Sequence, residues 1–366
     1  MRRTPALIIG GGPAGASAAI RLAQNGTPHL LLERSRDTGD ALCGGFLSWR
    51  TLESLARLGI EPDALGPARV TRVRMFAGER MSEAPLPRAA HGVSRHHLDT
   101  LLLARAHAAG APIERGIIVR ETTTRTARLH DGTTIAADAL FLASGKTDIR
   151  GLARPEAARG TDPTLGLRVR LGPAPGLDTL IGDAIELHLF DRGYAGLVLQ
   201  EDGTVNLCLA VHRSRLTHAG DPEKLLVAIA AECPRLGDRL AWRVPGAIDA
   251  IANVPYGWRA TAGESRLFRL GDQAGVIPSL AGEGMGIAIA SGIRAAEAYN
   301  RGGAAAAPAF QRRLARDLAR PIGLAGWVRD AAERPAITRA MFPIVRHAPI
   351  LVDLLARGTR IGHDPA

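Results

Sequence analysis

Three glycines near the start of the chain have the spacing of a phosphate-binding turn. Gly10, Gly12 and Gly15 follow an apolar run and precede a stretch that is rich in alanine. In the G-x-G-x-x-G pattern, the first glycine permits a tight turn, the second lets a pyrophosphate approach the backbone, and the third lets a helix pack on the strand. The phosphate charge then lies at a helix N-terminus, which stabilises it. This spacing predicts a dinucleotide-binding site.

The residues that follow complete the unit that such a turn requires. Residues 14–24 have helical periodicity, and residues 29–33 form an apolar strand that ends at Glu33. Glu33 comes 18 residues after Gly15, close to the position, about 20 residues on, whose carboxylate accepts from an adenosine ribose hydroxyl. The alternative is a glycine-rich turn of some other α/β protein, and this context makes it the less favoured interpretation.

Two later strands also end at polar or small residues. The buried strand 136–143 ends at Ser144, and the strand 267–270 leads into Asp272. Ligands of open α/β sheets bind beyond the carboxyl ends of the strands, so these residues and the first glycine turn can line one crevice. A glycine-rich loop and a helix follow Asp272, which predicts a second anchoring point for a long cofactor. The carboxylate of Asp272 is expected to accept from a sugar-like hydroxyl.

Several other residues fit either a functional or a structural role. Cys43 precedes two glycines that let the backbone approach a flat ligand, and a buried structural cysteine explains it equally well. Arg95 follows the capping residue Ser94, and a cation in the first turn of a helix is unfavourable unless it serves an anion nearby. Tyr194 and Trp258 fit the wall of a substrate pocket or ordinary packing.

The composition is that of a folded protein with an excess of basic residues. The 366 residues are 46% hydrophobic and 22% charged, which excludes extended disorder, and the length fits two packed domains. The net charge of +10 is spread along the chain, so nucleic-acid binding is not indicated. The three cysteines have neither metal-ligand nor disulfide spacing, and we predict no metal site.

The second half of the chain changes in character. Strand-like pieces at 165–171, 184–190, 196–200 and 204–211 predict an antiparallel sheet, interrupted by a helix at 222–233. The end of the chain predicts amphipathic, arginine-rich helices at 310–318, 322–331 and 350–355. We expect these helices to pack on the body, with contact to a membrane surface as the alternative. No apolar run approaches the ~18 residues of a membrane span, so we expect a cytoplasmic protein, peripheral to the inner membrane face at most.

Together these motifs resemble the flavoprotein superfamily that includes para-hydroxybenzoate hydroxylase and geranylgeranyl reductase. The resemblance covers most of the chain and rests on the glycine turn, Glu33, Arg95, Ser144 with Gly145, and above all the run 270–292. It implies a Rossmann-like α/β domain of the glutathione-reductase type that binds FAD, an inserted antiparallel β-sheet substrate domain and a C-terminal helical segment. The implied boundaries are 1–70, 90–155 and 256–305 for the FAD-binding domain, 71–89 and 156–255 for the substrate domain, and 306–366 for the helices.

The resemblance also implies roles for single residues. The first glycine turn would hold the FAD pyrophosphate, with Arg95 beside it. Glu33 would bind the adenosine ribose, and the backbone of Val119 would contact the adenine. Asp272 would bind the ribityl chain, and Gly282 to Met285 would face the flavin pyrimidine. The full set of implied cofactor-binding residues is Gly10, Gly12, Pro13, Ala14, Gly15, Glu33, Arg34, Cys43, Gly44, Arg95, Val119, Ser144, Gly145, Gly271, Asp272, Gly282, Gly284 and Met285. The residues implied to lie near the flavin as catalytic candidates are Cys43, Trp49, Tyr194 and Pro278.

Two reactions are typical of this superfamily, and the motifs divide between them. The loop 43–45 and the run 284–292 look closer to the reductases, and Gly275 replaces the histidine that is common in hydroxylases. Against the reductases, only Tyr194 remains of their Tyr-x-Trp-x-Phe-Pro motif. The Cys-Gly-x-Phe-Leu-Ser loop and the Ser-Gly-Lys strand end are similar to bacterial flavin oxidoreductases that act on lipophilic phenols and polyketides.

We therefore predict an FAD-dependent monooxygenase that hydroxylates a hydrophobic aromatic or polyketide-like substrate through a flavin hydroperoxide. NAD(P)H is the expected electron donor, bound transiently. Reduction of isoprenoid double bonds is the second expectation, and a flavin protein for electron transfer or enzyme maturation is the third.

Overall fold

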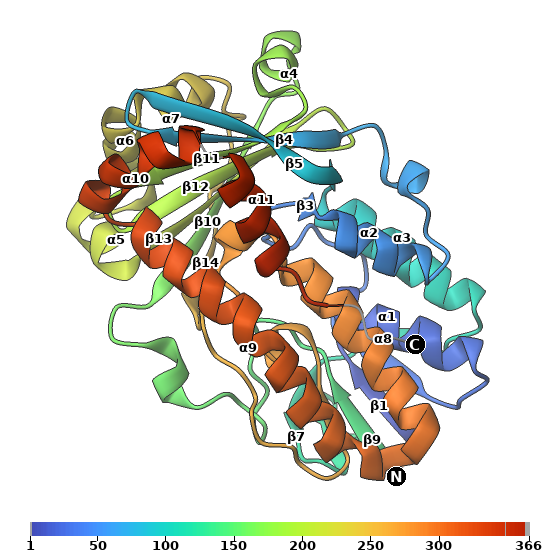
Figure 1. The fold of residues 1–366 in the computed structure, drawn as a ribbon. Helices are drawn as coiled ribbons and strands as arrows, with labels where there is room; N and C mark the ends of the chain where they lie inside the picture. The colour runs from blue at the N-terminus through green and yellow to red at the C-terminus, as the bar shows by residue number, and fades with distance from the viewer. Residues whose placement is uncertain (1, 348, 363–366) are drawn as a thin grey trace.

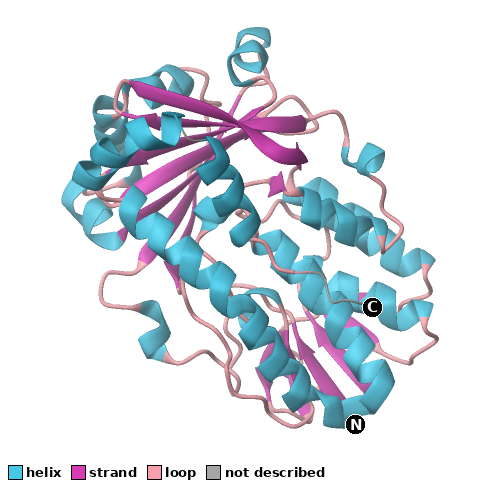
Figure 2. Cartoon of the chain, in the orientation of Figure 1, coloured by secondary structure: helices cyan, strands magenta, loops and turns pink. Residues whose placement is uncertain are grey.

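The computed structural model describes residues 2–347 and 349–362, which form two β-sheets flanked by helices (Figures 1 and 2). Sheet A has the order β6-β2-β1-β9-β8-β7, with β15 also paired to β9, and sheet B has the order β14-β10-β13-β12-β11-β4-β5-β3. The C-terminal helix α9 runs from sheet A to sheet B (Figure 1). The predicted mixed α/β fold with a helical C-terminal segment is confirmed.

Sheet A is parallel at its centre, where β1 pairs with β2 on one side and with β9 on the other. The C-terminal halves of its central strands, residues 6–9 of β1 and 139–142 of β9, are apolar and buried, as expected for strands that are covered on both faces. Its strands are β1 (Arg2–Ile9), β2 (Leu30–Glu33), β6 (Ile113–Arg115), β7 (Val119–Thr122), β8 (Thr126–Leu129), β9 (Thr134–Leu142) and β15 (Leu267–Arg269).

Three helices pack together on sheet A: α1 (Pro13–Gln24), α3 (Arg95–Ala108) and α8 (Gly284–Gly302). Glycines make this packing close. A Cβ on Gly15 would lie 1.9 Å from the backbone oxygen of Gly10, and a Cβ on Gly292 would lie 2.2 Å from that of Ala14. Neither position accepts a side chain, and the N-termini of α1 and α8 are thereby held at the same edge of sheet A.

Sheet B is antiparallel apart from the parallel pair of β4 and β11. Its strands are β3 (Phe46–Leu47), β4 (Arg69–Ala77), β5 (Arg80–Gly92), β10 (Thr164–Leu171), β11 (Ala184–Phe190), β12 (Gly193–Leu199), β13 (Val205–His212) and β14 (Asp249–Val254). A separate apolar core joins it to the short helices on one face, which are α4 (Pro175–Ile181), α5 (Arg213–Ala219), α6 (Pro222–Glu232) and α7 (Pro234–Leu240). Helix α2 (Trp49–Ala56) packs on α8.

The C-terminal helices are α9 (Ala307–Ala332), α10 (Pro335–His347) and α11 (Pro349–Gly358). The expectation of two helices at 310–318 and 322–331 is wrong, because α9 continues through Pro321. A proline inside a helix removes one backbone hydrogen bond, and here the buried side chains of Leu318, Ile322 and Ala325 pack on both sides of Pro321. Within the described residues, no helix combines the length and apolar character that crossing a membrane requires.

One strand prediction needs correction, and one strand was missed. The strand expected at 136–143 begins earlier, since β9 runs without a break from Thr134 to Leu142 after β8 has ended at Leu129. The turn at Asp131 lies between them, where the Asp131 carboxylate accepts from the Thr133 N–H at 2.9 Å. The sequence does not predict β5, because Pro85 and Pro87 within it are typical of turns. The domain boundaries stay predictions.

Candidate active site

The first glycine turn forms an anion-binding geometry with Arg95. Gly10 has a φ of +106°, which favours glycine, and Gly12 lies at the start of α1, whose first turn has no side-chain cap. A Cβ on Gly12 would lie 3.4 Å from Nη2 of Arg95. The N-terminus of α1 and one guanidinium therefore face the same space, which fits a pyrophosphate.

Arg95 is held in place by Asp99, one turn further along α3. Its Nε and Nη2 donate to the two carboxylate oxygens at 2.9 and 2.7 Å. Burial acts to lower the pKa of Arg95, but the charge of Asp99 and its hydrogen bonds outweigh burial and raise it. Arg95 is thus a fixed cation beside the glycine turn.

Glu33 lies at the end of β2, directly over the glycine turn. Its carboxylate accepts from the backbone N–H of Gly11 at 2.6 Å and from that of Ser35 at 2.8 Å. The Ile117 N–H donates to the backbone oxygen of Glu33 at 3.0 Å, which brings the segment before Val119 to this strand end. The backbone role of Val119 toward adenine stays a prediction.

Asp272, which follows β15, pairs with Lys146, which follows the neighbouring parallel strand β9. Nζ of Lys146 lies 3.3 Å from Oδ2 of Asp272, and this negative charge raises the pKa of Lys146. Arg154 donates to the backbone oxygens of Asp272 and Lys146 at 3.0 and 2.6 Å. Gly271 has a φ of +53°, so this strand end also requires glycine.

The loop after β9 lies between these two anchoring points. Gly145 has a φ of +61°, and its backbone oxygen accepts from Nε2 of Gln273 at 2.9 Å. The Ser144 hydroxyl donates to the backbone oxygen of Thr147 at 2.8 Å, and Nη1 of Arg34 reaches the Thr147 hydroxyl at 3.5 Å. The structure therefore brings the predicted residues Arg34, Ser144 and Gly145 to one crevice with Asp272.

The loop before α8 is shaped by glycine. Gly282 has a φ of +63°, and a Cβ there would lie 2.8 Å from the ring of Phe46. A Cβ on Gly284, the first residue of α8, would point into open space with no neighbouring atom within 4 Å, whereas the Met285 side chain is buried. The N-terminus of α8 is consequently open to a ligand.

A buried ion pair that the sequence did not indicate supports this loop. Glu283, with no exposed surface, accepts from Ser48 Oγ and from Arg360 Nη1, both at 2.9 Å. Arg360 Nη1 also donates to the backbone oxygen of Ala281 at 2.6 Å, and its guanidinium stacks 5.1 Å from the ring centroid of Trp49. The end of the chain is thus joined to the start of α8.

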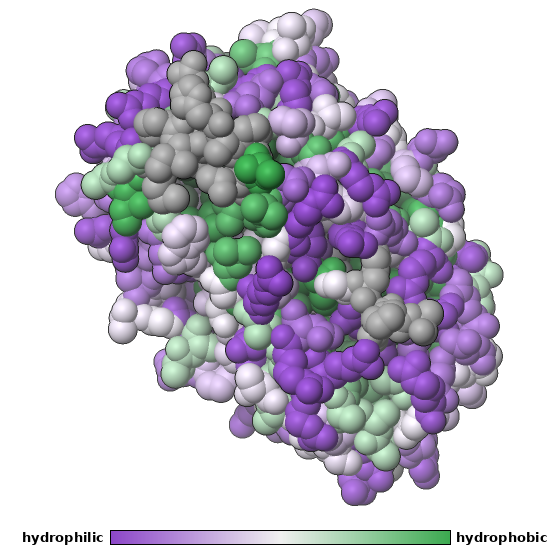
Figure 3. All heavy atoms as spheres, in the orientation of Figure 1, coloured by the Kyte–Doolittle hydropathy of each residue, from purple (hydrophilic) through white to green (hydrophobic). Residues whose placement is uncertain are grey.

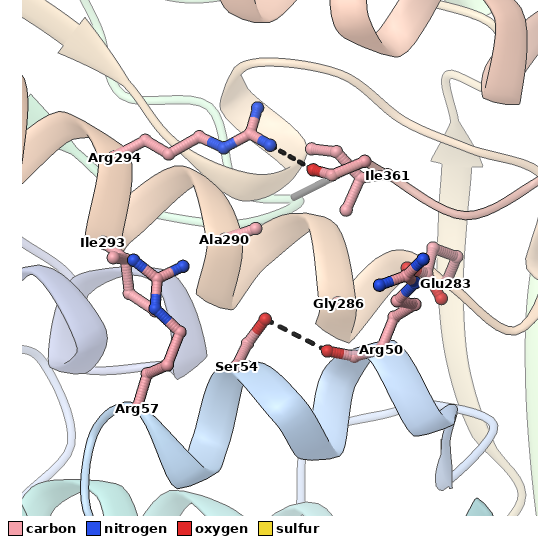
Figure 4. Close-up of a pocket in the computed structure, with 10 residues that line it drawn as sticks. Arg50, Ser54, Arg57, Glu283, Gly286, Ala290, Ile293, Arg294 and Ile361 are labelled. Carbon is pink, nitrogen blue, oxygen red and sulfur yellow. Dashed lines mark hydrogen bonds between the residues drawn. The ribbon is translucent and has the colours of Figure 1, made fainter. Parts of the chain in front are cut away.

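The surroundings of Glu283 leave its charge only partly compensated. Burial raises the pKa of this carboxyl, against the opposing charge of Arg360, and within the described residues its Oε1 has no hydrogen-bond partner. A cavity of about 10 Å³ borders Glu283 between α2 and α8, with Arg50 of α2 and Arg57, which directly follows α2, around it (Figure 4).

The loop at Cys43 is anchored from sheet B. The backbone oxygen of Cys43 accepts from Nδ2 of Asn206 at 2.8 Å and from Sγ of Cys208 at 3.0 Å. Burial raises the pKa of Cys208 to about 12, so this thiol stays protonated and can donate. Gly44 borders open space, and Gly45 has a φ of +74°. Asn206, a polar residue in an apolar strand, was the available signal for this anchor.

Tyr194 belongs to a hydroxyl cluster at the turn 278–282, which precedes α8. Its Oη lies 2.6 Å from the Ser279 hydroxyl and accepts from the Leu280 N–H at 2.9 Å. The Tyr256 hydroxyl donates to Ser279 at 2.7 Å. Burial raises the pKa of Tyr194 well above its usual value. Pro278 is buried at the start of this turn.

An apolar cavity of about 210 Å³ lies between sheet B, the C-terminal helices and the loop 280–282. Most of its lining side chains are aliphatic or aromatic. The lining residues are Phe46, Val73, Met75, Leu86, Ile185, Leu187, Leu189, Leu280, Ala281, Gly282, Ala325, Trp327, Val328, Ala331, Ala332, Thr338, Phe342, Leu355, Ala356, Thr359 and Arg360. The four catalytic candidates, which are Cys43, Trp49, Tyr194 and Pro278, are not among these lining residues. The catalytic role of these four residues stays a prediction.

Comparison with known proteins agrees with this geometry. Residues 3–151 match the family model described as an FAD binding domain. The chain is 26% identical over 325 residues to the chloroplastic geranylgeranyl diphosphate reductase of Arabidopsis thaliana, covering 82% of this chain and 66% of that protein, so it spans slightly less than two thirds of the plant relative. It is also 26% identical over 328 residues to the menaquinone reductase of Mycolicibacterium smegmatis, covering 82% of this chain and 77% of that protein.

Solved structures show the same fold. The flavin-dependent brominase Bmp2 superposes with a TM-score of 0.73 at 17% identity, covering 98% of this chain and 93% of the brominase. The open turn at Gly12 beside Arg95, the carboxylates of Glu33 and Asp272, and the open N-terminus of α8 all fit FAD. The role of each single residue in holding it stays a prediction.

Proposed function

We propose that this chain, whose residues 3–151 match an FAD binding domain and which is similar to geranylgeranyl diphosphate reductase, reduces a carbon–carbon double bond of an isoprenoid-like lipid. FAD, when bound and reduced, would supply a hydride to one alkene carbon, and a proton from water would complete the addition at the other carbon. The side chains of this protein bind the cofactor, hold the substrate chain and keep water out of the cavity.

The observation that carries this proposal is the apolar cavity that reaches the loop before α8. Leu280, Ala281 and Gly282 form one end of it, and Gly284 opens α8 two residues later. A hydrocarbon chain in this cavity would be stabilised by about 25 cal/mol for each Å² of apolar surface removed from water. The helix N-terminus at this end stabilises negative charge on a neighbouring group.

The few polar side chains of the cavity favour reduction over hydroxylation of a phenol. Thr338, Thr359 and Arg360 are the polar residues in the lining, and Arg360 is engaged with Glu283. Hydroxylation of a phenol is helped by a general base within hydrogen-bond reach of its hydroxyl. Among the described residues of the lining there is neither a carboxylate nor a histidine, whereas transfer of hydride to an alkene does not begin with removal of a substrate proton.

Hydroxylation of a hydrophobic aromatic substrate is the second candidate, and the hydroxyl cluster favours it. Ser279 is exposed and lies between the hydroxyls of Tyr194 and Tyr256. A phenol that enters beside Leu280 would find hydrogen-bond partners there. In that case the protein would insert one oxygen atom from O₂ in place of adding two hydrogen atoms.

We further propose NAD(P)H as the electron donor. A second, polar cavity of about 180 Å³ is lined by Lys146, Arg154 and Arg159 and by one carboxylate, Asp148. Asp148 pairs with Arg154, so the described lining keeps an excess of positive charge, which favours a phosphate-bearing ligand. Steady-state kinetics with NADPH and NADH test this: Arg159→Glu is expected to raise the KM for the donor with little change in flavin content, and an unchanged KM would contradict it.

Product analysis separates the two reactions. The FAD-loaded protein is reduced with dithionite and mixed with a long-chain isoprenoid and, separately, with a lipophilic phenol, with and without O₂. Reduction predicts an anaerobic product that has gained two hydrogen atoms. A product that has gained one oxygen atom, formed only with O₂, would instead support hydroxylation, and failure to bind FAD would contradict both.

A further inference from the structure

We propose that the exposed face of α9, together with the exposed apolar residues of α11, docks on an anionic lipid bilayer. This surface, called here the docking face, consists of Arg312, Arg316, Arg320, Trp327, Ile350 and Leu354. Trp327 of this face also lines the apolar cavity, so the proposal deepens the proposed function and rests on it for the identity of the substrate.

The first observation is a basic stripe along α9. Arg312, Arg316 and Arg320 are exposed and follow one another at intervals of four residues. Residues at this spacing lie on one face of a helix. Gly323 and Trp327 continue the same face toward the cavity, since they follow at intervals of three and four residues.

The second observation is a group of exposed apolar side chains where this stripe ends. Trp327 is 57% exposed and also lines the cavity. Ile350 and Leu354 are 67% and 57% exposed on α11, which packs against α9. Figure 3 shows hydrophobic side chains gathered on this face of the molecule, bordered by hydrophilic ones. Tryptophan is enriched where proteins meet the membrane interface.

Charge complementarity selects an anionic lipid surface as the partner. The acidic residues of α9 are already paired, because Asp317 lies 3.0 Å from Arg294 and Asp330 lies 2.7 Å from Arg329. The stripe therefore presents a local excess of positive charge, in line with the net charge of +10. Basic residues near a membrane are attracted by anionic headgroups, and apolar side chains beside them insert into the interface.

The consequence for the site is a direct route for a lipid. An isoprenoid in the bilayer would pass Trp327 and enter between α9 and α11 without crossing water. The apolar cavity, which ends at Leu280 to Gly282, then becomes a continuation of the bilayer interior. Detergent-dispersed substrate should reach the same cavity without the docking face.

The test is sedimentation of the FAD-loaded protein with vesicles. One set is phosphatidylcholine alone, and the other contains one third phosphatidylglycerol. We expect binding to the anionic vesicles only, a loss of at least about tenfold for the double variant Arg316→Glu/Arg320→Glu, and a similar loss for Trp327→Ser. Matched controls are Arg125→Glu, at a turn of sheet A, and Val227→Ser, which is 70% exposed on α6; both should bind as the wild type does.

The outcomes separate docking from catalysis. Arg316→Glu/Arg320→Glu should keep its turnover of detergent-dispersed substrate, since these arginines do not line the cavity. Equal vesicle binding by this variant and by Arg125→Glu would overturn the proposal. A dimer in solution that Trp327→Ser dissociates, without any vesicle binding, would also overturn it and assign the face to a second copy of the chain. Vesicle binding without turnover would refute only the proposed function.

Discussion

Replacement of Arg360 by alanine should destabilise the protein strongly, although this residue lies near the end of the chain. Arg360 is the cation that pairs with the fully buried carboxylate of Glu283, and its own side chain is only 7% exposed. It also holds the backbone oxygen of Ala281. The variant leaves a buried carboxylate without its counter-charge, directly before α8.

The size of the effect follows from this burial. Removal of one partner of a buried ion pair costs about 3–5 kcal/mol of the free energy of unfolding. Because burial already raises the pKa of Glu283, the variant should raise it further. The added cost is then small below about pH 4.5, where the carboxyl is protonated in both the folded and the unfolded state, and it increases as the pH rises.

Urea unfolding of the FAD-loaded protein at low and neutral pH measures this effect. Arg360→Lys should keep much of the stability, and Arg360→Met/Glu283→Gln should recover most of the loss, since the double variant buries no charge. The dissociation constant of FAD provides a second readout, because the pair supports the loop before α8. A loss below about 1 kcal/mol in Arg360→Ala, or a loss independent of pH, would refute the reasoning.

Three further predictions concern the cofactor turn, the cavity and a histidine. Gly12→Val should abolish flavin retention, because the added side chain meets Arg95 in the space for the pyrophosphate; Ala56→Val is the control, and absorbance of the purified protein is the measurement. Leu187→Trp should raise the KM of a long-chain substrate at least tenfold and leave FAD affinity unchanged, since Leu187 lines the apolar cavity; an unchanged KM would exclude this cavity as the substrate site. The hydrogen bond to Glu333 raises the pKa of His212 above 6.5, against the effect of burial. Its contribution to stability is therefore complete below pH 6.5 and lost as the pH rises through the raised value, so thermal melting should show that His212→Gln loses this part of the pH dependence.

The sequence predicts the parts of the fold that local patterns determine. The unit from Gly10 to Glu33 has a fixed spacing, and the structure brings its carboxylate onto the N–H of Gly11. The strand predicted at 184–190 has the same bounds in the structure. In these segments the apolar periodicity and the glycine spacing leave little choice of conformation.

The contacts that the sequence could not predict join residues far apart in the chain. The local sequence around Glu283 and that around Arg360 each give no indication of a charged partner. Only the packing of the folded chain shows that the two side chains meet. The parallel pairing of β4 with β11 brings residues 69–77 beside residues 184–190, which periodicity within either strand does not specify. The apolar cavity likewise arises from several elements, so its lining residues, such as Val73 and Phe342, carried no signal of their own.

Single-turnover chemistry in the absence of oxygen tests the central claim most directly. The FAD-loaded protein would be reduced, mixed anaerobically with an isoprenoid that carries several double bonds, and followed by the flavin absorbance while the product is analysed by mass. Our account predicts that the flavin is reoxidised as the lipid gains two hydrogen atoms, and that Leu187→Trp slows both changes together. Flavin that stays reduced until O₂ is admitted, with an unchanged lipid, would contradict it.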